Sequence, residues 1–276
     1  MSDSAEKVGA VPEQTGADRS SAEEAMPALS ADQLSDLLVQ VRHADSIELK
    51  LTVPDTRRRS TVVALGMDPL DAQIRQVTFF DTPDLTLSKN GVVVRARRIQ
   101  GKAGDTVVKL RPLDPSHLSA SLRRDKHFGV EIDAMPGGFV CSGSMKGEVK
   151  DKLLKEVLSG QHPIRKLFSK EQRALFEAHA LGVDLDALSI LGPINILKLK
   201  FSPADFGRKM VAELWFYPDN SQILELSTKC EPADAFQVAA ESKAFLASHG
   251  VDLGAPQQTK TKTAMEFFAA EMAAPA

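Results

Sequence analysis

Paired charged side chains recur at every second residue in several stretches of this 276-residue chain. A spacing of two residues places both side chains on the same face of a β-strand. In SIELKLTVP, residues 46–54, Glu48 and Lys50 share one face, while the residues between and beside them are apolar. The other cation pairs are Arg95 with Arg97, Lys109 with Arg111, and Lys198 with Lys200, and acids on comparable faces are Glu131, Asp133, Glu213 and Glu225.

These residue types suit a ligand that carries several phosphate groups together with a metal ion. Arg and Lys side chains bind phosphate oxygens, whereas carboxylates bind hard cations such as Mg²⁺ or Mn²⁺. A strand face that only contacts water usually mixes charges, because like charges two residues apart repel one another. We therefore expect the charged faces to point into a shared interior, where a polyphosphate and a divalent metal would neutralise them.

Eight segments have the alternation of a strand, and they come mostly as hairpins in two groups separated by a helical insert. The predicted strands are 45–53, 73–81, 92–99, 106–112, 121–133, 194–202, 208–218 and 222–229. The predicted helices are 30–41, 57–66, 82–91, 145–160, 169–182, 233–250 and 259–272, and 138–147 is interpreted as a loop with a helix cap. Such strands form a barrel or a sandwich. We expect an α+β fold in which an eight-stranded antiparallel β-barrel carries helices on its outside.

Composition narrows the class of protein. The net charge of −3 gives no overall attraction to nucleic acid or to an anionic membrane, and no apolar run reaches the ~20 residues of a membrane span. Cys141 and Cys230 are expected to be free thiols in a reducing compartment, so we expect a cytoplasmic protein. Residues 1–29 are expected to form a disordered tail before a single domain at 30–276, and the oligomeric state stays open.

Four stretches of the chain resemble the CYTH domain of the triphosphate tunnel metalloenzymes. SIELK (46–50) resembles the opening ExExK signature, and TFFDTPDLTLSKNGVVVRARR (78–98) resembles the family's Phe-Asp-Thr stretch, helix and basic strand. VVKLRP (107–112) resembles the Lys-bearing strand that follows, and ILELSTK (223–229) resembles the late acidic strand. Together they place the likeness across residues 44–265.

The resemblance implies a tunnel-shaped barrel that binds a triphosphate or nucleotide with Mg²⁺ or Mn²⁺. It implies triphosphate contacts from Lys50, Arg95, Arg97, Lys109, Lys198 and Lys200. Arg111 is added because it lies two residues after Lys109, on the same face of the predicted strand. It implies metal contacts from Glu48, Glu131 and Glu225, with Asp133 and Glu213 as further candidates. Glu48 and Lys50 are the candidate catalytic residues, and Lys260 or Lys262 corresponds to a late family lysine.

Two positions depart from the family pattern and keep other functions open. Ser46 and Ser227 stand where the pattern has acids, so we expect weaker metal binding. Hydrolysis of an inorganic or organic triphosphate is the first expectation, and a class IV-type adenylate cyclase of the same fold is the second. A non-catalytic sensor of polyphosphate or nucleotide is favoured by the two serines, and a β-rich structural module with charged outer faces is the plainest alternative.

Overall fold

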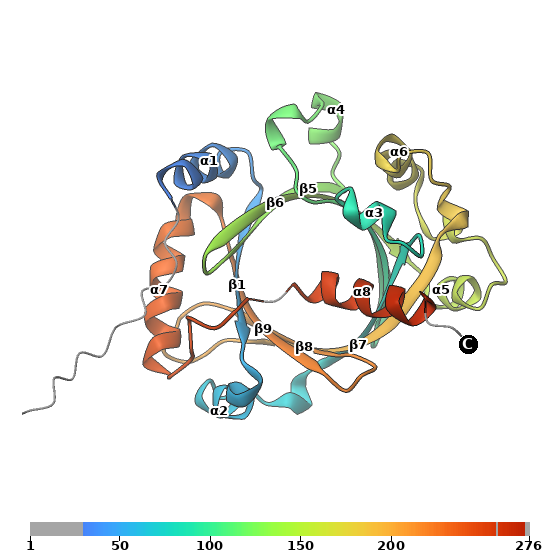
Figure 1. The fold of residues 1–276 in the computed structure, drawn as a ribbon. Helices are drawn as coiled ribbons and strands as arrows, with labels where there is room; N and C mark the ends of the chain where they lie inside the picture. Colours follow the sequence, from blue (N-terminus) through green and yellow to red (C-terminus); the bar gives the residue numbers. More distant parts are fainter. Residues whose placement is uncertain (1–29, 258, 274–276) are drawn as a thin grey trace, which may run out of the picture.

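The computed structural model describes residues 30–257 and 259–273, and within them nine strands close into one barrel with helices around it (Figure 1). The strands are β1 (Ser46–Val53), β2 (Gln73–Asp81), β3 (Val92–Ile99), β4 (Lys102–Leu110), β5 (Phe128–Met135), β6 (Gly138–Val149), β7 (Ser189–Phe201), β8 (Met210–Phe216) and β9 (Gln222–Cys230). The α-helices are α1 (Ala31–Val41), α2 (Arg58–Ala64), α3 (Thr86–Lys89), α4 (Ala120–Arg123), α5 (Asp151–Leu158), α6 (Lys170–His179), α7 (Ala235–Ser248) and α8 (Lys260–Ala273). The tail predicted at residues 1–29 lies outside the described residues.

Neighbouring strands follow the order β1-β5-β6-β4-β3-β2-β7-β8-β9, and β9 returns to pair with β1. The predicted closed barrel with outer helices is therefore confirmed. Two details differ from the prediction, because there are nine strands rather than eight and one pair is parallel. That pair joins β1 to β5, where Ser46 lies opposite Glu131, and all other neighbouring strands run antiparallel.

The ninth strand is β6, which the sequence reading assigned to a loop at 138–147 and to the start of a helix at 145–160. That prediction was wrong because glycines in the segment serve packing rather than turns. A Cβ atom on Gly143 would lie 2.5 Å from the ring of Phe128, and one on Gly147 would lie 2.6 Å from Gln172. Gly residues in a strand often mark such a close approach. The helix itself begins only at Asp151.

The predicted fifth strand at 121–133 also begins later than expected. Its first residues form the short helix α4, because the Ser119 hydroxyl accepts a hydrogen bond from the backbone N–H of Leu122 and so caps a helix start. Strand β5 then begins at Phe128. Local capping thus overrides the strand pattern over the first half of the segment.

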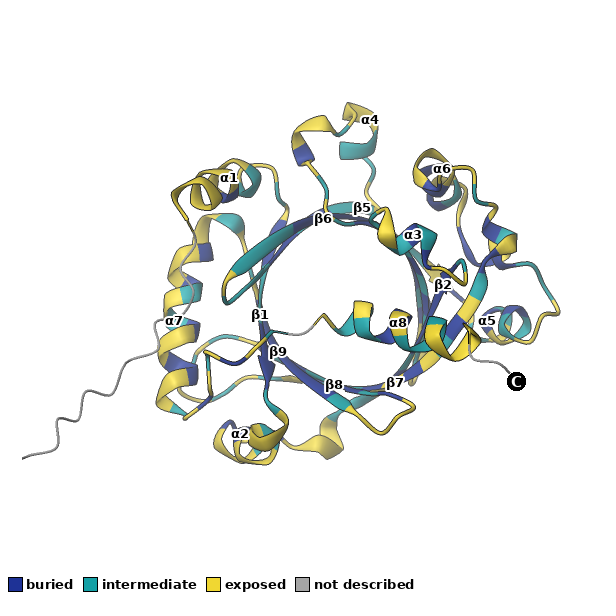
Figure 2. Ribbon diagram, in the orientation of Figure 1, coloured by how far each residue is buried: buried dark blue, intermediate teal, exposed yellow. Residues whose placement is uncertain are grey.

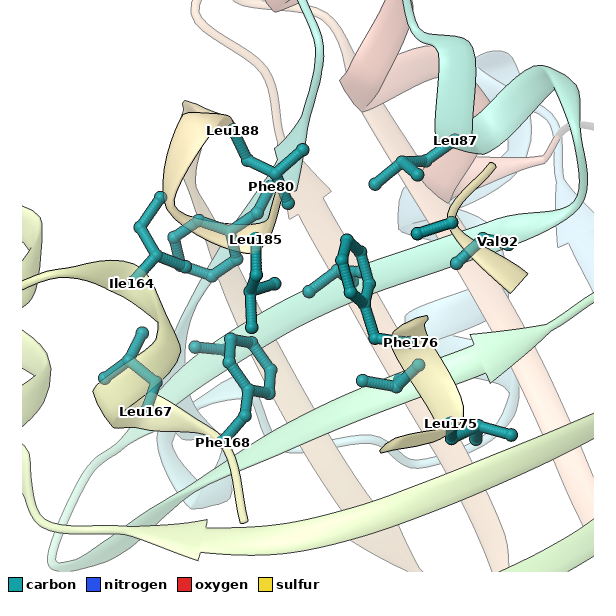
Figure 3. Packing of buried hydrophobic residues seen from close by; sticks show 14 of the residues in the cluster. Phe80, Leu87, Val92, Ile164, Leu167, Phe168, Leu175, Phe176, Leu185 and Leu188 are labelled. Atoms are coloured by element: carbon teal, nitrogen blue, oxygen red, sulfur yellow. The ribbon is translucent and has the colours of Figure 1, made fainter. Parts of the chain in front are cut away.

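The apolar face of most strands points outward and packs against helices. The burial colours show exposed residues on these outer helices and buried residues along the strands (Figure 2). The largest outer cluster packs α5, α6 and the 3₁₀ turns near them against β2, β3, β4 and β6, with Phe80, Phe168 and Phe176 at its centre (Figure 3). A second cluster packs α7 against β1, β8 and β9 through Phe245 and Leu246. None of the helices in the described ranges is long and apolar enough to cross a membrane.

Helix α8 lies across the barrel opening rather than on the outer wall (Figure 1). Its buried residues Ala264 and Met265 pack on apolar side chains that include Val77, Ile196 and Trp215. These three belong to the inward-facing set of their strands, because they also line the interior cavity. Apolar packing against α8 therefore fills part of the interior, and charged side chains surround the rest.

Candidate functional site: a charged cavity inside the barrel

Inward-facing side chains of most strands and the start of α8 line a cavity of about 320 Å³. Nine of the lining residues are cationic and four are acidic. The cations are Lys50, Arg75, Arg95, Arg97, Lys109, Arg111, Lys198, Lys260 and Lys262, and the acids are Glu48, Glu131, Glu213 and Glu225. Such an excess of positive charge in a confined space favours an anionic ligand.

The cavity brings together nearly all of the predicted site residues. Asp133 lies beside it, fully buried, within ion-pair distance of Lys50 and Arg111. Lys200 is different, because it shares the inward direction of Lys198 but is exposed at the end of β7 and does not line the cavity.

Sequence reasoning missed Arg75 on β2 and left open which of Lys260 and Lys262 belonged to the site. Arg75 was hidden because Gln76 and Thr78 share the outer face with Ile74, so the apolar alternation of this strand is weak at its start. The positions of Lys260 and Lys262 could not be predicted from strand alternation, because both lie on α8, and the packing of this helix against the barrel brings them to the cavity. A sequence signal for Arg75 existed in its period of two with Gln73 and Val77.

Three acids form a compact group on β1 and β5. One carboxylate oxygen from each of Glu48, Glu131 and Asp133 lies within 4.8 Å of the others. Lys50 contacts Asp133 at 2.7 Å and Glu48 at 3.2 Å, and Arg111 contacts Asp133 at 3.1 Å. Burial alone would raise the pKa of Asp133, but the positive charges of Lys109, Lys50 and Arg111 outweigh it and lower that pKa to about 2. Asp133 is therefore ionised at neutral pH.

This acid group has the chemistry of a site for a hard divalent cation. It offers three carboxylates at one place, from Glu48, Glu131 and Asp133. Lys50 contacts two of these carboxylates and Lys229 contacts the third, so a bound ion would share them with ammonium groups. Mg²⁺ and Mn²⁺ prefer oxygen donors of this kind. The residues present fit such an ion.

Glu213 and Glu225 form a second acid group, and here lysines already fill the space between the carboxylates. Lys198 donates to one oxygen of Glu213 at 2.6 Å. Lys260 donates to the other oxygen at 2.6 Å and to Glu225 at 2.7 Å. Burial would raise the pKa of Glu213, but Lys260 and Lys198 hold it well below its usual value. Trp215 adds an indole N–H bond to Glu213 at 3.3 Å.

Arg95 on β3 and Lys109 on β4 are less well compensated. Burial, and next to it the charge of Arg97, lower the pKa of Arg95 to about 10, and the Nε atom of Arg95 has no hydrogen-bond partner among the described residues. Burial lowers the pKa of Lys109 to about 8, although Asp133 opposes the shift. An anion bound between these side chains would stabilise their charged forms and satisfy the free donor.

The two serines that replace expected acids are both buried in the barrel wall. The Ser46 hydroxyl donates to Glu131 over 3.5 Å, and Ser227 lies opposite Lys50 in the pairing of β1 with β9. Hydroxyl groups at these two places add no negative charge beside Lys50 or the carboxylates.

No protein-family model matches the chain, and no curated protein matches its sequence. Solved structures do share its fold. A Hippeastrum protein, described as an adenylyl cyclase candidate with a dominant triphosphatase activity, superposes with a TM-score of 0.60 at 16% identity, covering 80% of this chain and 95% of that one. A Bacillus halodurans protein, named as an adenylate cyclase candidate, has a TM-score of 0.56 at 13% identity, covering 80% and 97%. At these identities the likeness shows a common barrel fold.

Proposed function

We propose that the cavity binds a triphosphate-containing ligand with a divalent cation and hydrolyses it, in the manner of the CYTH-type triphosphate tunnel enzymes. The observation that carries this proposal is the convergence of nine Lys and Arg side chains on one cavity, eight of them not exposed. Four acids line the cavity, and Asp105 and Asp133 beside it pair with some of the cations. Burying so much positive charge is costly unless a strongly anionic ligand compensates it. A triphosphate supplies several negative charges in an extended shape that a barrel interior can enclose.

The basic residues of the inner wall would bind the triphosphate. Arg95, Arg97 and Lys109 would clamp the phosphate oxygens through charge-assisted hydrogen bonds, with Arg111 and Lys198 beside them. Fixed cations also stabilise the charge that builds up on the phosphoryl oxygens as the bond to the leaving group breaks. Arg75 belongs to the same wall and would extend the clamp towards β2.

Glu48 and Lys50 would lie closest to the reacting group. Glu48 is partly accessible from the cavity, so its carboxylate can orient a water molecule and accept its proton. Lys50, held between Glu48 and Asp133, has its pKa raised because their charges, together with that of Glu225, outweigh its burial. It therefore stays cationic and can contact the phosphoryl oxygens.

Glu48, Glu131 and Asp133 would hold the Mg²⁺ or Mn²⁺ ion. When bound, that ion would supply charge neutralisation at the phosphate oxygens. The chain's own part is to present three carboxylates within 4.8 Å of one another.

The test is a panel of substrates with the purified full chain. Tripolyphosphate and ATP are each incubated with Mg²⁺ or Mn²⁺, and released phosphate, pyrophosphate and cyclic AMP are measured. We expect phosphate release from tripolyphosphate. Release of cyclic AMP and pyrophosphate from ATP would show that the protein is a cyclase and not a hydrolase. Binding without turnover would favour the sensor, which the buried hydroxyls of Ser46 and Ser227 support.

A thermal-shift measurement separates binding from catalysis. Tripolyphosphate should raise the unfolding temperature, because it binds only the folded barrel. Absence of any shift, together with absence of turnover, would overturn the proposal.

A further inference from the structure

Lys260 occupies the space between the carboxylates of Glu213 and Glu225, which the sequence analysis predicts to be metal ligands. Its ammonium group lies 2.6 Å from Glu213 and 2.7 Å from Glu225, the residues that face each other across β8 and β9. The Lys260 side chain is 11% exposed, and its Nζ atom also lies 5.1 Å from the centre of the Trp215 ring. One fixed cation therefore bridges both acids.

The two acid groups of the cavity differ in how many carboxylates they offer and in how lysines contact them. Each oxygen of Glu213 accepts a hydrogen bond, from Lys198 and from Lys260. Asp133 is contacted by Lys50 at 2.7 Å and by Arg111 at 3.1 Å, but it belongs to a group of three carboxylates within 4.8 Å of one another. A metal ion at Glu213 would find two carboxylates, both bonded to Lys260, whereas one at Asp133 would find three.

The fold holds Lys260 in this position. It is the first residue of α8, and its backbone carbonyl accepts a hydrogen bond of 3.0 Å from the Tyr217 hydroxyl. One turn further on, Ala264 and Met265 are fully buried against the inner wall. These contacts fix the start of the helix from which the Lys260 side chain reaches the two acids.

We propose that the Lys260 ammonium takes the place of a second divalent cation, so that the cavity binds one metal ion, at Glu48, Glu131 and Asp133. The inference rests on the proposed function, and it limits the metal site of that function to one ion. It removes Glu213 and Glu225 from the predicted metal ligands and gives them a different role, which is to position a permanent cation.

Counting bound Mn²⁺ tests this directly and needs no turnover. Free Mn²⁺ is followed by electron paramagnetic resonance while the full chain is titrated with Mn²⁺ alone. The wild-type protein should bind one equivalent. Lys260→Met should bind two, because Glu213 and Glu225 lose their bridging cation. Lys200→Met is the matched control, since Lys200 is exposed at the end of β7 and does not line the cavity, and it should still bind one.

A second pair of variants covers the case in which Lys260→Met does not fold. Glu131→Gln should weaken Mn²⁺ binding by about tenfold or more, and Glu213→Gln by less than about threefold, since only the first removes a ligand. Two equivalents in the wild type, one equivalent in a folded Lys260→Met, or the reverse order of the two glutamine variants would each overturn the role of Lys260. No bound Mn²⁺ in the wild type would instead overturn the metal site of the proposed function.

Discussion

Arg97 and Arg98 are consecutive residues of β3 whose side chains lie on opposite sides of the barrel wall. Inside, Arg97 donates two hydrogen bonds to Asp105, at 2.8 and 2.7 Å, and lines the cavity. Outside, Arg98 bonds Asp151 at the start of α5 at 2.6 Å. One strand thus carries a candidate ligand-binding arginine and a structural arginine side by side.

This pair gives a prediction with a built-in control. Arg97→Ala should weaken tripolyphosphate binding by at least about tenfold, because a charge-assisted hydrogen bond is worth ~1.5–3 kcal/mol. Arg98→Ala should leave the Kd within about twofold, since it removes only a partly exposed contact on the outer wall. Isothermal titration calorimetry measures both. Equal Kd values for the two variants would show that Arg97 does not contact the ligand.

Lys198 and Lys200 provide a second comparison, on β7. Both point to the same side of the strand, but only Lys198 lines the cavity. Lys198→Met should reduce triphosphate affinity by about tenfold, whereas Lys200→Met should change it little, because an exposed charge is screened by salt. Binding is measured at two salt concentrations. A larger loss of triphosphate affinity for Lys200→Met than for Lys198→Met would show that Lys200 belongs to the binding site, as the sequence analysis predicts.

Lys109 should make ligand binding depend on pH. Its pKa falls from 10.5 to about 8, chiefly through burial, so it loses its proton in the free protein as the pH rises through 8. An anionic ligand favours the protonated form, and binding at pH 8.5 should therefore take up protons. Because the unfolded chain holds this proton more tightly, the same shift makes the free energy of unfolding rise between about pH 8 and 10.5.

Proton uptake is measured by calorimetry in buffers with different ionisation enthalpies. Lys109→Arg should take up fewer protons than the wild type at pH 8.5, since arginine stays charged. The protons bound by tripolyphosphate itself are the same in both titrations and cancel in the comparison. Equal uptake in the two proteins would exclude Lys109 as the titrating group.

Gly143 on β6 should be intolerant of a side chain. A methyl group there would meet the Phe128 ring at 2.5 Å and Leu113 at 2.8 Å, so Gly143→Ala should lower the free energy of unfolding by about 1–3 kcal/mol. Gly138→Ala, on the same strand, meets nothing within 4 Å and serves as the control. Urea denaturation of both variants gives the comparison. Equal stabilities would mean that the ring moves aside without cost.

The sequence predicts the barrel because period-two alternation is strong wherever one strand face is apolar, as in β1, β3 and β9. It fails at β6, where small residues at Gly143 and Gly147 weaken the pattern and their partners Phe128 and Gln172 come from elsewhere in the chain. It also fails at α4, where the Ser119 cap decides the local conformation. The first failure comes from contacts that a short sequence window does not contain, whereas the second comes from a local helix cap that competes with the strand pattern.

For the cavity, alternation is enough to select the inward cations of β3 and β4, since each side chain direction follows from its neighbours. The pairing of acids with particular cations cannot be predicted in this way. Lys260 reaches Glu213 and Glu225 from a separate helix, and its distance from them follows from how α8 packs on the inner wall. Which cation contacts which acid can therefore be seen only in the three-dimensional structure.

The seam at which β1 pairs with both β5 and β9 has a consequence for biosynthesis. Strand β1 leaves the ribosome early, but its two neighbours lie about 85 and 180 residues further along the chain, at Glu131 for Ser46 and at Cys230 for Ile47. During translation one edge of β1 stays open until β5 emerges, and the other edge stays open until β9 emerges. Contacts this distant in sequence slow folding and leave strand edges able to pair with other chains, so this protein should depend on chaperones that bind nascent chains.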